Sequence, residues 1–108
     1  MTAPIIHFDI SGPDDEDLRG FYRDVFDWTV DDKGPGYALV ETPGLRGAVV
    51  EADAPSITLG VGVADLAAAV DSAVAHGAAL VMPPTDNGWV TKAQIADPCG
   101  NVVTLIQT

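Results

Sequence analysis

The chain has 108 residues, 47% of them hydrophobic, which is enough for one domain with a buried core. Its formal net charge of −11, from 16 acidic and 5 basic residues, argues against binding to nucleic acid or to an anionic membrane surface, because both need clustered Lys and Arg. No apolar run approaches the ~20 residues of a membrane span. The N-terminus lacks signal-peptide features and Cys99 has no partner for an internal disulfide, so we expect a cytoplasmic protein.

The first half of the chain predicts a strand, a helix and three further strands. Residues 5–10 alternate in hydrophobicity, and a turn at residues 11–14 ends at Asp14, which can cap a helix. The predicted helix has an apolar stripe at the spacing i, i+3, i+4, i+7, formed by Leu18, Phe21, Tyr22 and Val25. Turns rich in Gly and Pro then separate the predicted strands 28–30, 37–41 and 46–51.

The second half repeats this order. A strand is predicted over residues 57–63, and a helix begins at Asp65 with the stripe Leu66, Val70, Ala73 and Val74. His76 and Gly77 suit the end of that helix. The remaining strands are predicted over residues 80–82, 92–96 and 102–107, and the last two are joined by the turn at residues 97–101.

The two halves are copies of one βαβββ unit, because Ile6 and Asp14 recur with a constant offset at Ile57 and Asp65. One unit alone would leave an apolar sheet face uncovered. We therefore predict a single α+β domain over residues 1–108, with repeat halves at about 4–52 and 56–108. Its expected architecture is one curved eight-stranded mixed sheet with helices on the convex face and a pocket on the concave face.

Three segments, "IIHFDISGPDDEDLRGFYRDVFDW", "VADLAAAVDSAVAHGAAL" and "ADPCGNVVTLIQT", carry a resemblance to a known family. Together they resemble the glyoxalase/bleomycin-resistance/extradiol-dioxygenase (vicinal oxygen chelate) superfamily, over nearly the whole chain. The resemblance supports the predicted fold. It does not fix the function, because this superfamily contains both metalloenzymes and plain binding proteins.

The resemblance also implies where metal ligands would lie, on the first and last strands of each half. The first-strand positions are His7 and Thr58, and the last-strand position of the second half is Thr104. The remaining ligand position falls on the predicted strand at residues 46–51, near Val49, with Glu51 two residues on and on the same face. A neutral threonine hydroxyl is a poor ligand for Zn, Fe, Mn or Ni, so we predict no cofactor; a divalent metal at His7 and Glu51 is the alternative.

Strand alternation predicts which side chains line the pocket. The expected lining comprises His7, Asp9, Thr58, Gly60, Gly62, Val102, Thr104 and Ile106. The two strand glycines indicate either the close approach of a ligand or a bulge. Tyr37 and Trp89 are expected at the rim as ligand contacts, whereas Trp28 is at least half structural and Cys99 has no activating neighbour.

The preferred hypothesis is a metal-free protein that binds or sequesters a small organic ligand, like the drug-binding members of this superfamily. One alternative is a metal-dependent lyase, isomerase or dioxygenase that uses His7, Glu51 and Glu41. Another is a cofactor-free enzyme with His7 and Asp9 as an acid/base pair. The resemblance also implies a homodimer, and the short link at residues 52–56 would allow the copies to exchange halves.

Overall fold

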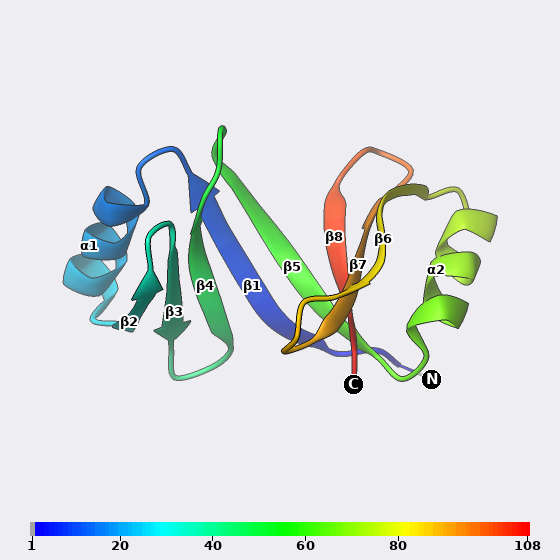
Figure 1. Cartoon of the computed structure of the whole chain (residues 1–108), viewed down its shortest axis with the longest axis horizontal. Helices are drawn as coiled ribbons and strands as arrows, with labels where there is room; N and C mark the ends of the chain where they lie inside the picture. Colours follow the sequence, from blue (N-terminus) through cyan, green and yellow to red (C-terminus); the bar gives the residue numbers. More distant parts are fainter. Residues whose placement is uncertain (1) are drawn as a thin grey trace. The chain divides into compact units, whose positions relative to one another are not determined.

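The computed structural model describes residues 2–108, which form eight strands and two helices (Figure 1). Contacts divide them into two compact units. The N-terminal unit comprises His7–Thr58, and the C-terminal unit comprises residues 2–6 together with Leu59–Thr108. The units follow the sequence repeat closely. They differ from the predicted halves only in that each unit takes the first residues of the other half's leading strand.

The N-terminal unit is a four-stranded mixed sheet with one helix. Its sheet order is β2-β3-β4-β1; β1 runs parallel to β4 and the other neighbours are antiparallel. The parallel pair is possible because α1 forms the first part of the connection between them. The elements are β1 (Ile5–Gly12), α1 (Asp15–Phe26), β2 (Thr29–Gly34), β3 (Tyr37–Glu41) and β4 (Arg46–Glu51).

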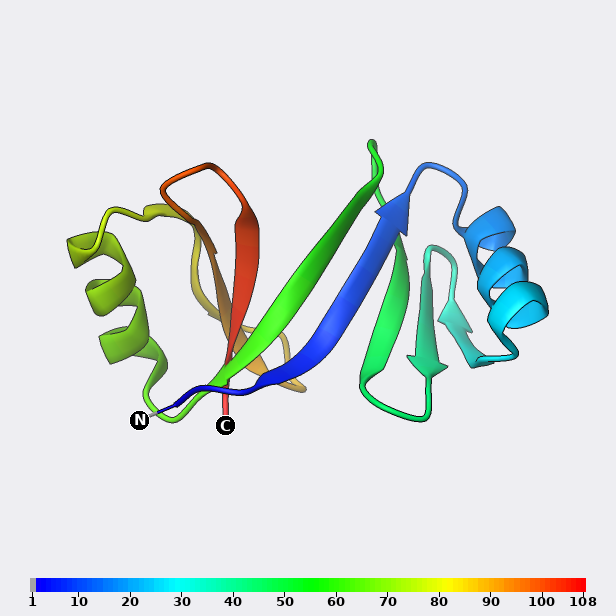
Figure 2. The same ribbon diagram turned by 180° about the vertical axis from the view of Figure 1, so that it is seen from behind.

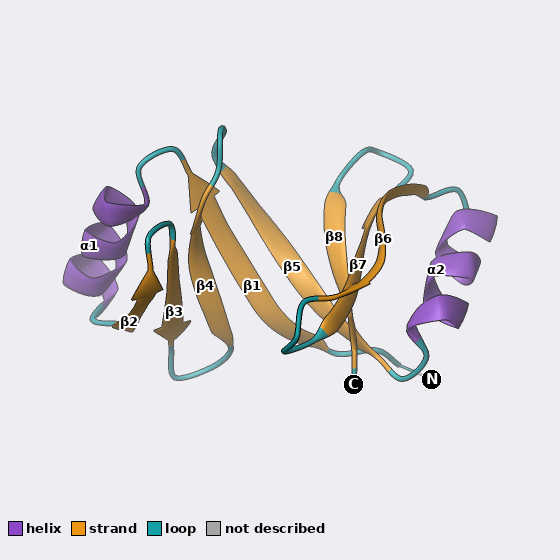
Figure 3. Ribbon diagram, viewed as in Figure 1, coloured by secondary structure: helices purple, strands orange, loops and turns teal. Residues whose placement is uncertain are grey.

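The C-terminal unit repeats this topology in the order β5-β8-β7-β6, with β5 parallel to β8. Figures 2 and 3 show the helix of each unit beside the strands of that unit. Its elements are β5 (Ser56–Val63), α2 (Leu66–Ala75), β6 (Ala79–Asp86), β7 (Thr91–Ala96) and β8 (Val102–Gln107). Within the described residues, neither helix is long and apolar enough to cross a membrane.

The predicted fold class is confirmed as α+β, with eight strands in one open mixed sheet. The start of the chain belongs to the C-terminal unit, where the Gly62 amide donates a hydrogen bond to the Pro4 carbonyl at 2.9 Å. The curvature of the sheet and the common concave pocket stay predictions.

Both helices begin where the sequence predicts. The Asp14 carboxylate accepts a hydrogen bond from the Asp17 amide at 3.0 Å, and the Asp65 carboxylate accepts one from the Ala68 amide at 3.1 Å. Each carboxylate satisfies an amide that has no partner within its helix. The second helix ends at Ala75, and Gly77, which follows the C-cap residue His76, has a φ of 103° that favours glycine.

The cores of the two units differ. In the C-terminal unit, α2 and the sheet share a buried cluster of Leu66, Val70, Ala93 and Leu105. In the N-terminal unit the buried apolar residues all come from strands, and they are Ile10, Ala38, Val40, Ala48 and Val49. The apolar stripe predicted for the first helix is therefore only partly buried, because Phe21 and Val25 remain 53% and 57% exposed.

Two strands extend four residues past their predicted ends. β2 extends to Gly34 across an irregularity after Asp32, and β6 continues past Met82 through Pro83 and Pro84. Proline cannot donate to a sheet ladder, which argues for ending the strand there. The prolines are tolerated because β6 lies at the edge of the sheet and the register shifts between Met82 and Thr85.

Candidate functional site

Strand register divides the side chains of the N-terminal unit between two faces of its sheet. A Cβ at Gly47 would clash with the ring of Phe8, and one at Gly12 would lie 3.1 Å from Leu18 of α1. Even-numbered positions of β1 therefore lie on the face that carries α1. The alternate positions form the opposite face, which we call the open face. Its residues on β1, β4 and β3 are His7, Asp9, Ser11, Arg46, Ala48, Val50, Tyr37, Leu39 and Glu41.

The side chains of His7 and Asp9 are hydrogen-bonded to each other on the open face. The His7 Nε2 and Asp9 Oδ1 atoms are 3.0 Å apart, and the two side chains are 27% and 25% exposed. A carboxylate that accepts a hydrogen bond from one ring nitrogen fixes the tautomer and leaves the other nitrogen, Nδ1, as an acceptor. This arrangement is suited to holding a ligand's hydrogen-bond donor or to taking a proton.

Tyr37 belongs to the same face and is held in its neutral form. Burial of the ring, and to a smaller extent the negative charge of Asp9, raises the pKa of Tyr37 above its usual value. The phenol therefore remains a hydrogen-bond donor at neutral pH. Between the polar groups the accessible surface of the open face is apolar, because Leu39 and Val50 are half-buried there, whereas Ala48 is fully buried beneath them.

The open face is hollowed over its outer strands. A depression of about 340 Å³ is lined by Thr29, Val30, Asp31, Leu39 and Glu41. The carboxylates there are matched by cations: Lys33 Nζ lies 2.8 Å from Asp31, and Arg46 Nε lies 3.5 Å from Glu41. Within residues 2–108, Asp9 has only the ring of His7 as a side-chain partner.

The predicted ligand position near Val49 was wrong. Val49 pairs with Ile10 on the face that carries α1 and is fully buried. The repeat identifies Ala48 as the position equivalent to Thr104. Ala48 pairs with Asp9, just as Thr104 pairs with Gly60 in the other unit. Alanine has no atom that can ligate a metal, so the last-strand position of this unit does not fit one.

Glu51 does not share a face with His7. It pairs with Gly12, two positions on from Val49, so it lies on the α1 side of the sheet. A joint site of His7 and Glu51 on this sheet is therefore contradicted. Glu41 does share the open face with His7, but its carboxylate is engaged by Arg46. Among residues 2–108, no group of three or more His, Cys, Asp or Glu side chains is placed to hold a metal ion.

The matching face of the C-terminal unit is polar but uncharged at its centre. Thr104 is buried, and its hydroxyl accepts a hydrogen bond from the Gln94 amide at 3.2 Å. The sequence analysis missed Gln94. Counting back from the turn at residues 97–101 would have found it, because Ala96 pairs with Val102 and Gln94 therefore pairs with Thr104.

The two strand glycines of this unit differ in their surroundings. Gly60 pairs with Thr104 and is buried. A Cβ at Gly62 would lie 2.9 Å from Thr108 Cγ2 and 3.1 Å from Ile6 Cδ1. Protein atoms therefore account for the glycine at 62, and Gly62 is not explained by a ligand. Thr58 lies half-buried on β5, within the N-terminal unit.

The aromatic residues and the cysteine have separate environments. Trp28 stacks on Tyr22 with 5.3 Å between ring centroids and also contacts Phe8, so its role is structural. Trp89 is 76% exposed in the loop between β6 and β7, where its backbone amide donates a hydrogen bond to Asn87 Oδ1. Cys99 is exposed in the turn before β8. Neither Trp89 nor Cys99 belongs to the unit that carries His7 and Asp9.

Solved structures with the same fold include proteins of different activities. Methylmalonyl-CoA epimerase from Mycobacterium tuberculosis aligns with a TM-score of 0.73 and 19% identity, covering 95% of this chain and 86% of that one. A superfamily member from Vibrio splendidus 12B01 aligns with a TM-score of 0.73 and 14% identity over 99% and 100% of the chains. The Mn(II)-bound glyoxalase from Novosphingobium aromaticivorans aligns with a TM-score of 0.71 and 15% identity. The alignment covers 97% of this chain and 38% of that one. At these identities the likeness shows the fold alone.

Sequence comparison identifies the family. No curated protein matches the chain. A family model described as the Glyoxalase/Bleomycin resistance protein/Dioxygenase superfamily matches residues 5–105, which is nearly the whole chain. This match agrees with the two βαβββ units and with the fold of the solved structures. The chain belongs to the Glyoxalase/Bleomycin resistance protein/Dioxygenase superfamily.

Proposed function

We propose that the protein binds a small organic molecule without a metal ion, and that the ligand contacts the open face of the N-terminal unit. The observation that carries this proposal is the chemistry of the last-strand positions. Ala48 has no donor atom, and the Thr104 hydroxyl already accepts from Gln94. A catalytic metal site needs about three protein ligands, which these residues do not supply.

The open face offers a small site with mixed chemistry. Leu39 and Val50, both half-buried, provide apolar contact, while His7, Asp9 and Tyr37 provide one ring nitrogen, one carboxylate and one phenol. Small-molecule sites combine an apolar lining with a few convergent polar groups in this way. The adjoining depression of about 340 Å³ falls within the usual size of such sites.

Two measurements test the proposal. Inductively coupled plasma mass spectrometry on protein purified without chelator should find no stoichiometric transition metal, and one metal per chain would overturn the metal-free part. A fragment screen by NMR, using uncharged aromatic and heteroaromatic compounds, should shift the signals of His7, Asp9, Tyr37 and Leu39. A screen in which no fragment saturates those signals would overturn ligand binding at the open face.

The two histidines of the chain provide a matched control. His7→Ala should weaken a fragment hit by roughly tenfold, the scale of one lost polar contact to a partly buried site. His76 lies at the end of α2, where its Nδ1 atom is 2.7 Å from the Ser72 carbonyl, so His76→Ala should leave the affinity unchanged. Equal effects of the two substitutions would contradict the assignment.

The bond of 3.0 Å between His7 and Asp9 favours a second candidate, a cofactor-free enzyme. Here His7 acts as the acid/base group and Asp9 orients it. If a hit from the fragment screen carries an acidic C–H, its exchange with deuterium should be accelerated by the protein. Asp9→Asn should slow that exchange while the fragment still binds. Equal exchange rates with and without protein would rule out this candidate and leave the binding proposal standing.

A further inference from the structure

The helix α1 presents an apolar surface that its own sheet does not cover. Phe21, Val25 and Phe26 are exposed by 53%, 57% and 53%, whereas Tyr22 turns inward onto Trp28. Single exposed apolar side chains are common, but a group of this size on one helix marks an interaction surface.

The exposed rings are held in fixed positions. The ring of Phe21 meets that of Tyr22 edge-on at 5.1 Å and 84°, and that of Phe26 at 6.4 Å and 80°. Aromatic pairs of this geometry stabilise one another, so Phe21 loses little conformational freedom when a partner covers it. Preorganised aromatic side chains are frequent anchors of protein interfaces.

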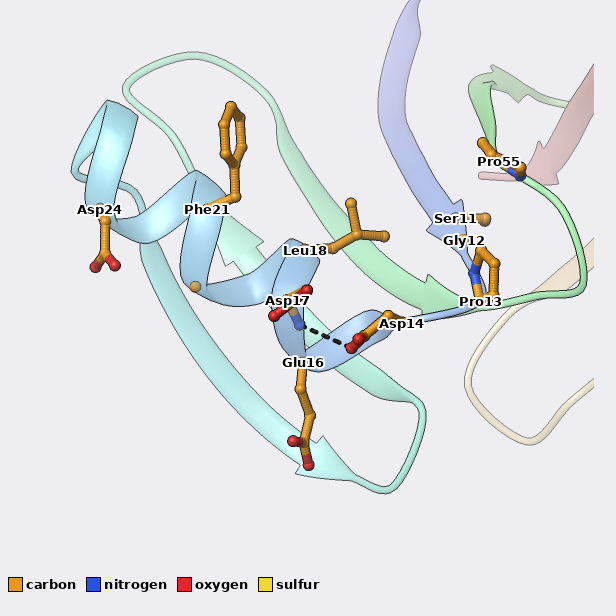
Figure 4. Close-up of a pocket in the computed structure, with 11 residues that line it drawn as sticks. Ser11, Gly12, Pro13, Asp14, Glu16, Asp17, Leu18, Phe21, Asp24 and Pro55 are labelled. Atoms are coloured by element: carbon orange, nitrogen blue, oxygen red, sulfur yellow. Dashed lines mark hydrogen bonds between the residues drawn. The ribbon is translucent and has the colours of Figure 1, made fainter.

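A depression of about 650 Å³ lies next to these rings (Figure 4). Its apolar part is formed by Pro13, Leu18, Phe21 and Pro55. In Figure 4, Leu18 and Phe21 extend on one side of α1, while Glu16 and Asp24 extend on the other. Apart from Ser11 at the end of β1, its lining lies outside the open face, so the depression shares no residue with the site proposed above.

The charges around this depression are negative. Its lining includes the carboxylates Asp14, Glu16, Asp17 and Asp24. Asp17 is four residues before Phe21, which makes the two residues neighbours on the helix surface.

The arginines of α1 are already engaged. Arg19 lies 2.8 Å from both Asp15 and Asp32, and Arg23 lies 3.2 Å from Asp24. No cation within residues 2–108 pairs with Glu16 or Asp17. A second copy of the chain would bring further carboxylates to this surface, and like charges oppose that contact.

We propose that α1 docks a basic amphipathic segment of a partner protein. In this arrangement an apolar side chain of the partner covers Phe21 and Leu18, and a Lys or Arg residue of the partner faces Asp17. Amphipathic helices bind apolar grooves in this way, and complementary charge sets their orientation and association rate.

The test uses three synthetic helical peptides of equal length and the intact protein. One peptide carries Leu on one face and Lys on the other, the second replaces Lys by Glu, and the third replaces Leu by Ser. We expect saturable binding of the Leu/Lys peptide alone, with NMR shifts confined to α1 and the adjoining residues 11–14. No saturable binding of that peptide, or equal binding of the Lys/Ser peptide, would overturn the proposal.

Matched variants identify the surface. Phe21→Ala should weaken the Leu/Lys peptide by about tenfold or more, while Val74→Ala on the exposed side of α2 should not. Asp17→Asn should weaken it about twofold to fivefold at low salt and have no effect at high salt, with Asp71→Asn on α2 as the control. Unchanged affinity in both α1 variants would overturn the proposal, and the Asp17 variant decides the question if Phe21→Ala does not fold. Self-association abolished by Phe21→Ala would also overturn it in favour of a second copy.

Discussion

The two units share a topology but place their chemistry differently. In the N-terminal unit the open face carries His7, Asp9 and Tyr37, and α1 carries exposed aromatic and acidic side chains. In the C-terminal unit the centre of the matching face is the neutral pair Thr104 and Gln94, and α2 buries Leu66 and Val70 in a shared core.

If the two proposals above hold, the two copies divide their roles. The C-terminal unit uses its helix to complete a core, which is the role expected of a scaffold. The N-terminal unit builds its core from strands and leaves both the open face and the outer surface of α1 available to other molecules. The predictions below test this division in order of expected effect.

The largest expected difference concerns the first leucine of each helix. Leu66 of α2 is 3% exposed within the core cluster, whereas Leu18 of α1 is only half-buried. Leu66→Ala should lower the free energy of unfolding by about 2–4 kcal/mol, and Leu18→Ala by about half as much. Urea denaturation of both variants measures this, and equal losses would contradict the proposed division.

Gly47 tests the strand-built core of the N-terminal unit. A Cβ at this position would clash with the ring of Phe8, which lies flat against the strand. Gly47→Ala should therefore cost about 1–3 kcal/mol through overpacking. Gly20→Ala provides the control, because its Cβ would meet only the end of Arg23 at 3.5 Å, and alanine should stabilise the helix by about 0.5–1 kcal/mol. A neutral Gly47→Ala would mean that Phe8 moves freely.

The two helix caps should also differ. Asp65→Ala removes the only carboxylate at the start of α2 and should cost about 1 kcal/mol. Asp14→Ala removes an equivalent cap but also relieves repulsion among Asp15, Glu16 and Asp17, so its cost should be smaller. Thermal unfolding at low and high salt compares them. The difference should shrink as salt rises, and a larger loss for Asp14→Ala would be inconsistent with this account.

The smallest effect is a titration on the open face. Because burial and then the charge of Asp9 raise the Tyr37 pKa, the folded state holds the phenol proton more tightly than the unfolded state. The resulting contribution to the stability of the folded state is complete below the unfolded pKa of about 10. It is lost as the pH rises through the pKa of Tyr37 in the folded state. Tyrosinate absorbance should show a later titration in wild type than in Asp9→Asn, and coincident curves would exclude the influence of Asp9.

Local patterns predicted the fold well because each depends on a few neighbouring residues. The repeat, the caps at Asp14 and Asp65, and the strands Tyr37–Glu41 and Arg46–Glu51 all agree with the structure. The extension of β6 through its two prolines did not follow from the sequence, since it depends on the strand lying at a sheet edge.

The candidate site was harder to predict because it depends on pairing between distant strands. A register error of one residue exchanges the two faces of a sheet, and this is how Val49 and Glu51 were assigned instead of Ala48. The exposure of the aromatic rings of α1 was missed for a similar reason. Helical spacing indicates which residues share a face, but not how far the neighbouring sheet covers them.

The position of the chain's first residues has a consequence for rearranging the gene. The Pro4 carbonyl accepts a hydrogen bond from the Gly62 amide, and the Thr108 amide donates one to the Val63 carbonyl. Pro4 and Thr108 therefore both lie against the end of β5, within the C-terminal unit. A circular permutant that joins these ends by a short linker and opens at the connection after Glu51 would encode each unit as a nearly continuous segment. Such a chain would let either unit be replaced separately by that of a relative, which the natural order of the chain prevents.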